Sequence, residues 1–540
     1  MMKRMTFLMT AAIAAAVSAG ASPKPLAEVL RAHVAAFNAA DEELYTNAVP
    51  NADAAAFLLE NVPLFECPDE TITRTYYFRW WTFRKHLRQT PDGWVVTEFL
   101  PNVGWAGKHN TISCPFGHHL REGRWLRDAR FVDDYLRFMV SEGSINGRRA
   151  YATWPAWGAC ERAKITGDEA LLVELLPRFV ANYEAWEKGW PSSGVSLRDV
   201  ENRQGARGRP YQAGFRSERG LFDFVGTREG TECALSVDGA RPMVNAAMWA
   251  EATSIAAIAR IAGRADLAAV YAEKAAVLRQ NILAQLWNPS VGFYTALSAD
   301  GELDDVCELH GYAPFYFGLS QPASRYGAFA ALFDAKGFAA PKGLAYVRRD
   351  TPGFDLSRDL SRHECLWNGP SWPYATSVAL TALYGALQTT PSAVPLKADD
   401  FAALLHQYAA QQVLTRPDGR VVPWIDENLD PITGAWIARD HMIAWDRAGI
   451  RPLKYVERGK DYNHSTFCDL VIAGLCGLCP QKDGTLQVRP LAPSAWAWWK
   501  LERVRFRGRD VTVLYDRDGT RYGCGKGLVV LDPAGKARAR

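Results

Sequence analysis

Pairs of helical segments, each joined by a short turn, recur along the middle of this 540-residue chain. The first pair covers residues 151–165 and 169–188, and apolar residues follow the spacing of an amphipathic helix in its second member. Similar pairs follow at residues 244–262 with 266–287 and at residues 371–387 with 400–413. Each pair is predicted to fold as an antiparallel helix hairpin.

The hairpins recur at uneven intervals with long loops between them, which does not fit a regular solenoid. A closed, mainly α-helical toroid of helix hairpins fits this spacing better. The small, apolar residues of 246–262 suit a helix of its inner ring. The long loops would then gather at one end and build a pocket.

The composition of the two ends predicts four regions. Residues 1–21 are predicted to be a signal peptide, 22–70 a partly helical N-terminal cap, and 71–480 the helical domain. Residues 481–540 contain short β-type runs separated by Asp-Gly and Arg-Gly turns, which predicts a small C-terminal antiparallel β module.

The signal peptide prediction rests on three features in the expected order. Lys3 and Arg4 precede an apolar run over residues 7–17, and the small residues 19–21 fit a cleavage site before Ser22. The apolar run is too short to span a membrane comfortably. We therefore expect a periplasmic or secreted protein without stable membrane insertion.

Charge and composition narrow the function classes. Sixty-two basic residues against 59 acidic ones leave a net charge of +3, which gives no electrostatic indication of nucleic-acid binding. The 19 tryptophans fit either a large core or a carbohydrate-binding cleft. The ten cysteines are mostly isolated, and one CxxC at residues 476–479 is a weak zinc signal. Buried thiols, no metal and no cofactor are expected, although export would permit disulfides.

Four segments are too polar and too aromatic to be ordinary helix linkers: residues 104–125, 226–245, 363–373 and 423–465. His118 and His119 lie near Glu122 but lack the HExxH spacing of a zinc site. They are better interpreted as core histidines, or as histidines that support a site from its outer layer. Trp367 and Trp372 could serve packing alone. Glu232 and Glu427 could be salt-bridge carboxylates, and Asp238 could simply begin a turn.

These segments could nevertheless hold the carboxyl pair of a glycosidase. One carboxyl must keep its proton at neutral pH, which requires an apolar or anionic environment. The other must remain ionised to activate water.

Three of the segments resemble the (α/α)6-barrel glycoside hydrolases, which include trehalases, processing α-glucosidases and mannosylglycerate hydrolases. The run DGARP at 238–242 with the following helix is similar to their acid loop. The run WNGPSWP at 367–373 is similar to their W-x-G-P-x-W signature, and ENLDPITG at 427–434 resembles their E-x-x-x-P-x-T-G stretch. The likeness covers roughly residues 70–480 and is nearest to mannosylglycerate-hydrolase-like proteins.

The resemblance implies roles for individual residues. Glu427 matches the catalytic base and Asp238 best matches the acid, with Glu232 and then Glu229 as alternatives because the acid motif is irregular here. The family's D-S-x-F-H stretch is absent, and residues 117–125 occupy its place. The expected substrate contacts are Trp105, His119, Trp125, Glu232, Arg241, Asn245, Trp367 and Trp372.

The sequence thus predicts an exported glycoside hydrolase that removes an α-linked sugar from an oligosaccharide or glycan with inversion. Two alternatives remain open at this point. A polysaccharide lyase on a helical toroid could use Tyr462 and His464, and a non-catalytic carbohydrate-binding protein could use the same aromatic pocket.

Overall fold

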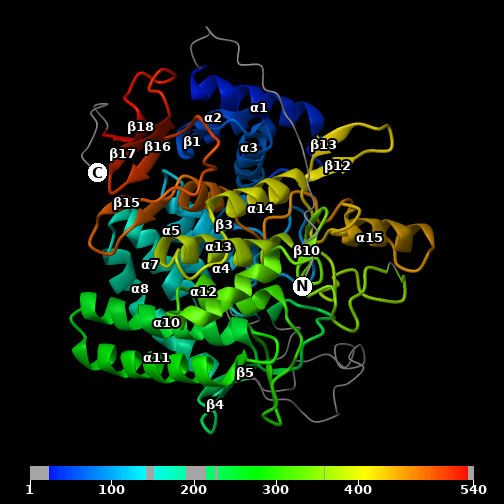
Figure 1. Ribbon diagram of the computed structural model, residues 1–540. Coiled ribbons are helices and arrows are strands. Elements are labelled where there is room, and N and C mark those ends of the chain that lie inside the picture. Colours follow the sequence, from blue (N-terminus) through cyan, green and yellow to red (C-terminus); the bar gives the residue numbers. More distant parts are fainter. Residues whose placement is uncertain (1–23, 142–150, 190–213, 225–228, 358, 533–540) are drawn as a thin grey trace, which may run out of the picture.

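The computed structural model describes residues 24–141, 151–189, 214–224, 229–357 and 359–532 (Figure 1). The predicted signal peptide lies outside these residues. The described chain is mainly helical with small antiparallel sheets. None of its helices combines the length and the apolarity that a bilayer span requires.

The three predicted hairpins are confirmed. They are α7 (Pro155–Thr166) with α8 (Ala170–Lys188), α10 (Pro242–Ile261) with α11 (Ala265–Gln285), and α13 (Pro373–Thr389) with α14 (Ala398–Ala410). The other α-helices of the described residues are α1 (Leu26–Ala40), α2 (Ala54–Asn61), α3 (Glu70–Lys85), α4 (Phe116–Gly123), α5 (Arg130–Met139), α12 (Ala313–Tyr316) and α15 (Ile437–Arg447).

The two members of the middle hairpin differ in burial, as their sequences predict. Helix α10 starts with Pro242 at its first turn and is buried on nearly all sides, which suits its alanine-rich, apolar composition. Helix α11 buries only a stripe that includes Tyr271, Leu278 and Ile282. In Figure 1 these two green helices run side by side, with α10 toward the centre.

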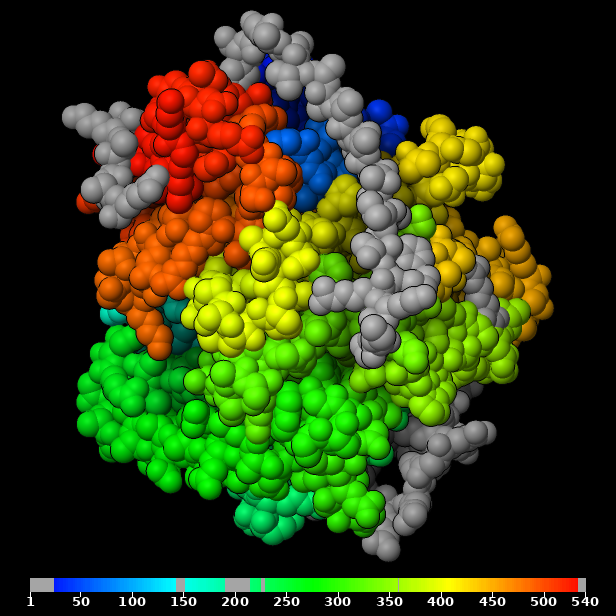
Figure 2. Space-filling view, in the orientation of Figure 1, coloured from blue at the N-terminus to red at the C-terminus, as the bar shows by residue number. Residues whose placement is uncertain are grey.

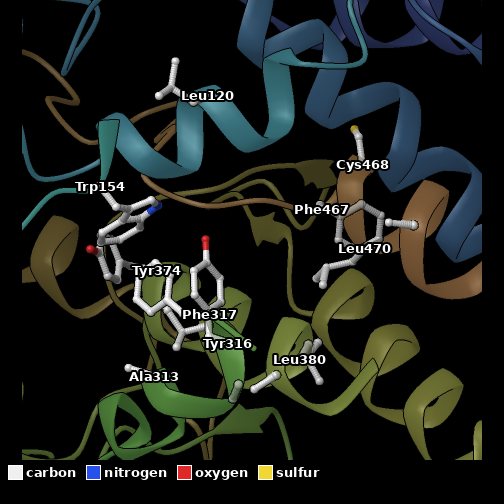
Figure 3. Packing of buried hydrophobic residues seen from close by; sticks show 14 of the residues in the cluster. Leu120, Trp154, Ala313, Tyr316, Phe317, Tyr374, Leu380, Phe467, Cys468 and Leu470 are labelled. Atoms are coloured by element: carbon white, nitrogen blue, oxygen red, sulfur yellow. The ribbon is translucent and has the colours of Figure 1, made fainter. Parts of the chain in front are cut away.

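Successive helices of the central region contact one another. Helix α4 packs against α7, α7 against α10, α10 against α12, and α12 against α13. Helix α13 also contacts the π-helical turn Leu470–Leu475. Residues far apart in the sequence thereby meet around the same core, where Trp154, Phe317 and Tyr374 lie between these helices (Figure 3).

The C-terminal sheet is not formed by C-terminal residues alone. Strands β16 (Trp498–Phe506), β17 (Arg509–Asp516) and β18 (Gly527–Leu531) are antiparallel neighbours, and β1 (Leu64–Glu66) adds a fourth strand beside β16. In the space-filling view the red and orange C-terminal residues accordingly adjoin the blue N-terminal region (Figure 2). The region expected to be a cap therefore completes the sheet of the C-terminal module.

Candidate active site

A cavity of about 210 Å³ lies where the four polar and aromatic segments meet. Four carboxyl side chains line it: Glu98, Glu232, Glu364 and Glu427. The remaining lining residues are mostly aromatic or nitrogen-bearing: Phe99, Trp105, Ile112, Cys114, Tyr151, Gly230, His363, Cys365, Trp367, Trp372, Tyr374, Arg458, Tyr462 and His464. The loops between helices thus build one pocket, as the hairpin pattern predicts.

Glu427 lies on the loop between β13 (Val421–Pro423) and α15. This loop is fixed to the segment of Trp372, because Leu429 and Ser371 exchange backbone hydrogen bonds of 2.7 and 2.9 Å. Asn428 adds a second attachment, since its Nδ2 donates to the carbonyl oxygen of Glu364 at 3.1 Å. The two residues that follow Glu427 are therefore both attached to the segment 363–373, which fixes the backbone next to Glu427.

Arg458 connects two of the carboxylates. Its guanidinium forms an ion pair with Glu427 and donates a second hydrogen bond, of 2.9 Å, to Oε1 of Glu364. Burial on its own raises the pKa of Glu364, but the charges of His363 and Arg458 outweigh it and lower the pKa to about 2. Paired buried charges of this kind stay ionised while both partners are present.

Cys365 contacts the same base candidate. Its Sγ donates to Oε1 of Glu427 at 3.5 Å, while Arg458 binds the other oxygen. Burial and the charge of Glu427 raise the pKa of this thiol well above its ordinary value. The thiol is therefore a protonated donor that helps to orient Glu427.

Two other carboxyls have the opposite electrostatic environment. Burial raises the pKa of Glu232, the charge of His363 opposes this rise, and the charges of Glu427 and Glu364 reinforce it. Burial also raises the pKa of Glu98, to about 8, with a further contribution from Glu427. The pocket therefore contains carboxyls whose pKa values are pushed apart, which is the arrangement that general acid–base catalysis requires.

The aromatic wall is built around the Gly-Pro turn at residues 369–370. Trp367 and Trp372 stack with ring centroids 4.0 Å apart and planes 8° apart. Trp372 also donates from Nε1 to the carbonyl oxygen of Leu366 at 2.8 Å. Trp105 differs from both, since 52% of its surface is exposed. These three of the four predicted tryptophans line the cavity.

The predicted acid Asp238 is not among the residues that line this cavity. It directly precedes β6 (Gly239–Ala240), which pairs with β5 (Leu221–Phe224) and β9 (Leu297–Ser298). A Cβ at Gly239 would lie 2.0 Å from the carbonyl oxygen of Leu297, so close strand packing explains the glycine that follows Asp238. Of the three predicted acid candidates, Glu232 is the one that shares the cavity with Glu427.

Arg241, Asn245 and the third acid candidate, Glu229, also lie off the cavity lining. Arg241 forms ion pairs with Glu229 at 2.6 Å and with Glu308 at 3.1 Å. Asn245 exchanges hydrogen bonds of 2.8 Å with both backbone groups of Phe222. Arg241 and Asn245 thus anchor the start of α10 to Glu229, to Glu308 and to strand β5. This structural role accounts for their presence in the DGARP run at 238–242 and the helix that follows it.

His119 and Trp125 are placed in the core beside the pocket instead of on it. Both are buried, and Nε2 of His119 lies 2.9 Å from the carbonyl oxygen of Asn463. Trp125 donates from Nε1 to Asp469 at 2.8 Å. Their polar atoms are thus used to join α4 to the chain near residues 463–469.

One group of potential metal ligands occurs among the described residues. His363, Glu364 and Cys365 each offer a ligand atom, and these atoms lie within 4.8 Å of one another. Arg458 already neutralises Glu364 from the same pocket, and a cation is disfavoured next to that guanidinium. Absence of a metal remains a prediction, which chelation can test.

The sequence did not single out Glu98, Glu364 and Arg458 as site residues. Glu364 lies inside one of the four segments, so the aromatic context was a usable signal. Glu98 follows the apolar strand β3 (Gly93–Val96), where a single carboxyl interrupting an apolar run was the only indication. Arg458 lies in an irregular, highly charged stretch, and no local pattern distinguishes it.

Comparisons with known proteins identify the family of this chain. The family model described as mannosylglycerate hydrolase MGH1-like glycoside hydrolase domain matches residues 108–465, which is more than half of the chain. The chain belongs to this family. The resemblance inferred from the motifs is thereby confirmed. A second model, the C-terminal domain of glycosyl hydrolase family 65, matches residues 480–532 of this MGH1-like protein.

Several solved structures are similar to this chain. A protein named "Sialidase" is 30% identical over 95% of this chain, with a TM-score of 0.81. A GH78 family rhamnosidase of a Bacillus species is 14% identical over 88% of the chain, with a TM-score of 0.54. The MGH1-like chain spans 44% and 42% of these two proteins, respectively. A GH63 mannosylglycerate hydrolase from Thermus thermophilus is 12% identical over 74% of the chain and 99% of its own length, with a TM-score of 0.46.

Proposed function

We propose that this chain is a glycosidase that releases an α-linked sugar from an oligosaccharide or glycan by inversion. Glu427 is the base and Glu232 the acid in this proposal. The observation that carries it is the placement of both carboxyls on one tryptophan-lined cavity. Membership of the MGH1-like family supports the reaction class.

The proposed mechanism follows from the environments of the two groups. Arg458 forms an ion pair with Glu427, and in this proposal the Glu427 carboxylate accepts a proton from water as that water attacks the anomeric carbon. Glu232 has a raised pKa and can hold the proton that the departing oxygen needs. Trp105, which is 52% exposed, provides an apolar face for a sugar ring, and the stacked pair Trp367 and Trp372 forms part of the cavity wall.

We also propose that the helix pairs close into an (α/α)6 toroid around this cavity. The succession of contacts from α4 through α7, α10 and α12 to α13 supports that arrangement. Export through cleavage before Ser22 is part of the same proposal. N-terminal sequencing of the protein from the culture medium or periplasm tests it, and a cytosolic protein that retains Met1 contradicts it.

The cavity favours hydrolysis over the lyase alternative. Tyr462 and His464 do line it, but burial and the charge of Glu427 raise the pKa of Tyr462 well above its ordinary value, so the phenol stays protonated and is not available as a base near pH 7. Among the described residues, Arg458 is the one Lys or Arg side chain on the lining, and two carboxylates already pair with it. A uronate carboxylate would therefore meet a predominantly acidic pocket.

The experiment is a panel of aryl glycosides and oligosaccharides assayed for released sugar with the native protein and with Glu427→Gln. Hydrolysis that falls by about 10²–10⁴ in the variant supports the proposal. Glu273→Gln, on the exposed face of α11, is the matched control and keeps full activity. Ultraviolet-absorbing unsaturated products identify a lyase, and the absence of any product favours the binding protein.

A further inference from the structure

Glu98 is a cavity carboxyl to which the proposed reaction assigns no role. Its Oε1 accepts a hydrogen bond of 3.1 Å from Nε1 of Trp105. Its Oε2 is shielded from solvent and has no hydrogen-bond partner in the described part of the chain. A buried polar atom without a partner is costly in a folded protein, and a bound ligand is one way to satisfy it.

The loop that carries Glu98 and Trp105 is braced from within. The backbone N–H of Glu98 donates to the carbonyl oxygen of Asn110 at 2.8 Å. The side chain of Asn110 in turn donates to the carbonyl oxygens of Phe99 and Pro101 and accepts from the N–H of Val103. The two side chains are therefore presented by a pre-organised loop, as precise recognition requires.

The charges around Glu98 favour its protonated form. Burial raises its pKa to about 8; the hydrogen bond from Trp105 and the charge of Arg458 oppose this rise, and Glu427 and Glu232 reinforce it. Glu98 interacts with four further titratable groups, electrostatically with the first three and through a backbone hydrogen bond with the last: Cys114, Tyr135, Tyr462 and His464. Burial raises the pKa of the first three and lowers that of His464, so all four are neutral near pH 7.

Trp105 complements this carboxyl with an exposed aromatic face. More than half of its surface is exposed, and its ring packs against the guanidinium of Arg458, whose Cζ lies 5.3 Å from the ring centroid. The indole N–H is fixed by Glu98, so the orientation of the ring depends on that carboxyl.

We propose that Glu98 and Trp105 form one sugar-recognition unit, in which the Glu98 carboxyl donates a hydrogen bond from Oε2 to an oxygen of a neutral sugar while the Trp105 ring covers a C–H face of that sugar. This inference rests on the proposed function. Glu98 is a positioning and specificity residue here, and Glu232 remains the acid. Analogues that lack the recognised hydroxyl should be rejected strongly, because they leave Oε2 buried and unpaired.

Protonation gives the unit a pH dependence. A neutral sugar that fills the cavity removes water from Glu98, so its protonated form binds the sugar better than its ionised form. Affinity is then constant below pH 7 and falls about tenfold per pH unit above pH 8, because one proton must be taken up on binding. Glu98→Gln keeps a hydrogen-bond donor but has no proton to lose. The decrease in affinity above pH 8 should therefore be absent in this variant.

The first experiment monitors the unit itself. The protein is labelled with ¹⁵N at the tryptophan indoles, and the Trp105 signal is identified as the one missing in Trp105→Phe. The signal is expected to shift with a midpoint near pH 8 in the native protein and to stay constant in Glu98→Gln. A Trp105 signal that does not respond to pH in the native protein overturns the inference.

The second experiment measures recognition with activated glycosyl fluorides, which need no acid and therefore isolate Glu98 from Glu232. Glu98→Ala should lower kcat/KM by about 100-fold, mainly through KM. Glu98→Gln should lower kcat/KM by less than about tenfold at pH 6, and the loss of affinity above pH 8 should be absent in this variant. Glu273→Gln should match the native protein. Both Glu98 variants behaving like the native protein at every pH overturns the inference. The inference is also overturned if Glu98→Gln loses activity on aryl glycosides but keeps full activity on glycosyl fluorides, because that pattern identifies Glu98 as the proton donor of the reaction.

Failure of the proposed function is recognised separately. If the native protein hydrolyses no member of the panel, binding of the same sugars is measured by calorimetry at pH 6 and pH 9. Binding that weakens at pH 9 in the native protein but not in Glu98→Gln supports the unit without hydrolysis, and equal binding at both pH values overturns it.

Discussion

Arg458 and Glu427 form a buried ion pair inside the cavity, and the same guanidinium donates to Glu364. One cation therefore balances two carboxylates from loops that are 63 positions apart in the sequence, since 427 − 364 = 63. The pair fixes the proposed base and links the two loops, so its removal has separable effects on catalysis and on stability.

Replacement of Arg458 by Met is expected to remove the cation that the buried Glu427 and Glu364 carboxylates share, with His363 left 3.6 Å from Glu364. The free energy of unfolding should fall by about 3–5 kcal/mol at pH 7, as for other broken buried ion pairs. Activity should fall by at least about 100-fold even where the protein remains folded. Denaturant unfolding and kinetics on the best panel substrate measure the two effects.

Two variants serve as references for that change. Arg458→Lys keeps the charge and should recover part of both losses, although Lys cannot reproduce the two-branched contact. Arg264→Met breaks an exposed pair with Asp266 and should leave the free energy of unfolding nearly unchanged. Equal stability of the native protein and Arg458→Met contradicts the role given to the pair.

The acid assignment separates Glu232 from Asp238. Glu232→Gln is expected to lower hydrolysis of substrates with poor leaving groups by about 10²–10⁴ and to spare glycosyl fluorides. Because the proton must be present on Glu232, native activity should also be lost as pH rises through its raised pKa. Asp238→Asn, off the cavity, should show neither effect. The reverse pattern restores the assignment that the sequence motif suggests.

Chelation should leave the activity intact. His363, Glu364 and Cys365 are the ligand group found among the described residues, and Arg458 competes with any cation there. Assay after exhaustive dialysis against EDTA is the measurement. Loss of activity that zinc or calcium restores shows that this tripeptide binds a metal.

His118 should make the fold sensitive to acid. It is buried against Tyr374 with ring centroids 4.3 Å apart, and neither ring nitrogen has a hydrogen-bond partner among the residues that the structure describes. Burial lowers its pKa from 6.5 to about 3. The unfolded chain therefore takes up a proton below pH 6.5 that the folded chain does not, and stability falls as pH decreases.

Replacement of His118 by Phe should remove about 2 kcal/mol of the difference in unfolding free energy between pH 7 and pH 5. Urea unfolding at both pH values is the measurement. A pH dependence that is unchanged in His118→Phe contradicts this role.

His406 should change the stability with pH in the opposite direction, because its hydrogen bond to Asp69 raises its pKa. Its contribution is present at low pH and fades as pH rises, so His406→Ala should lose stability mainly at pH 5.

The sequence predicts the helices better than the pocket. The small-residue pattern of α10 and the apolar stripe of α11 follow directly from which sides of each helix are buried, so periodicity finds them. Trp125 and Trp372 show the limit, because both lie in aromatic loops and only the spatial contact decides which one meets the cavity. Glu98 lies outside the four segments, and Arg458 lies in a part of the segment 423–465 that carries no motif, so tertiary packing brings both to Glu427.

The configuration of the first-formed sugar tests the proposed pairing of Glu427 with Glu232 most directly. Proton NMR during hydrolysis of the best α-glycoside, recorded before mutarotation is complete, distinguishes the two anomers. The β anomer is expected to appear first, because water activated by Glu427 attacks the face opposite the departing oxygen. Initial release of the α anomer contradicts the inverting mechanism and the roles given to both carboxyls.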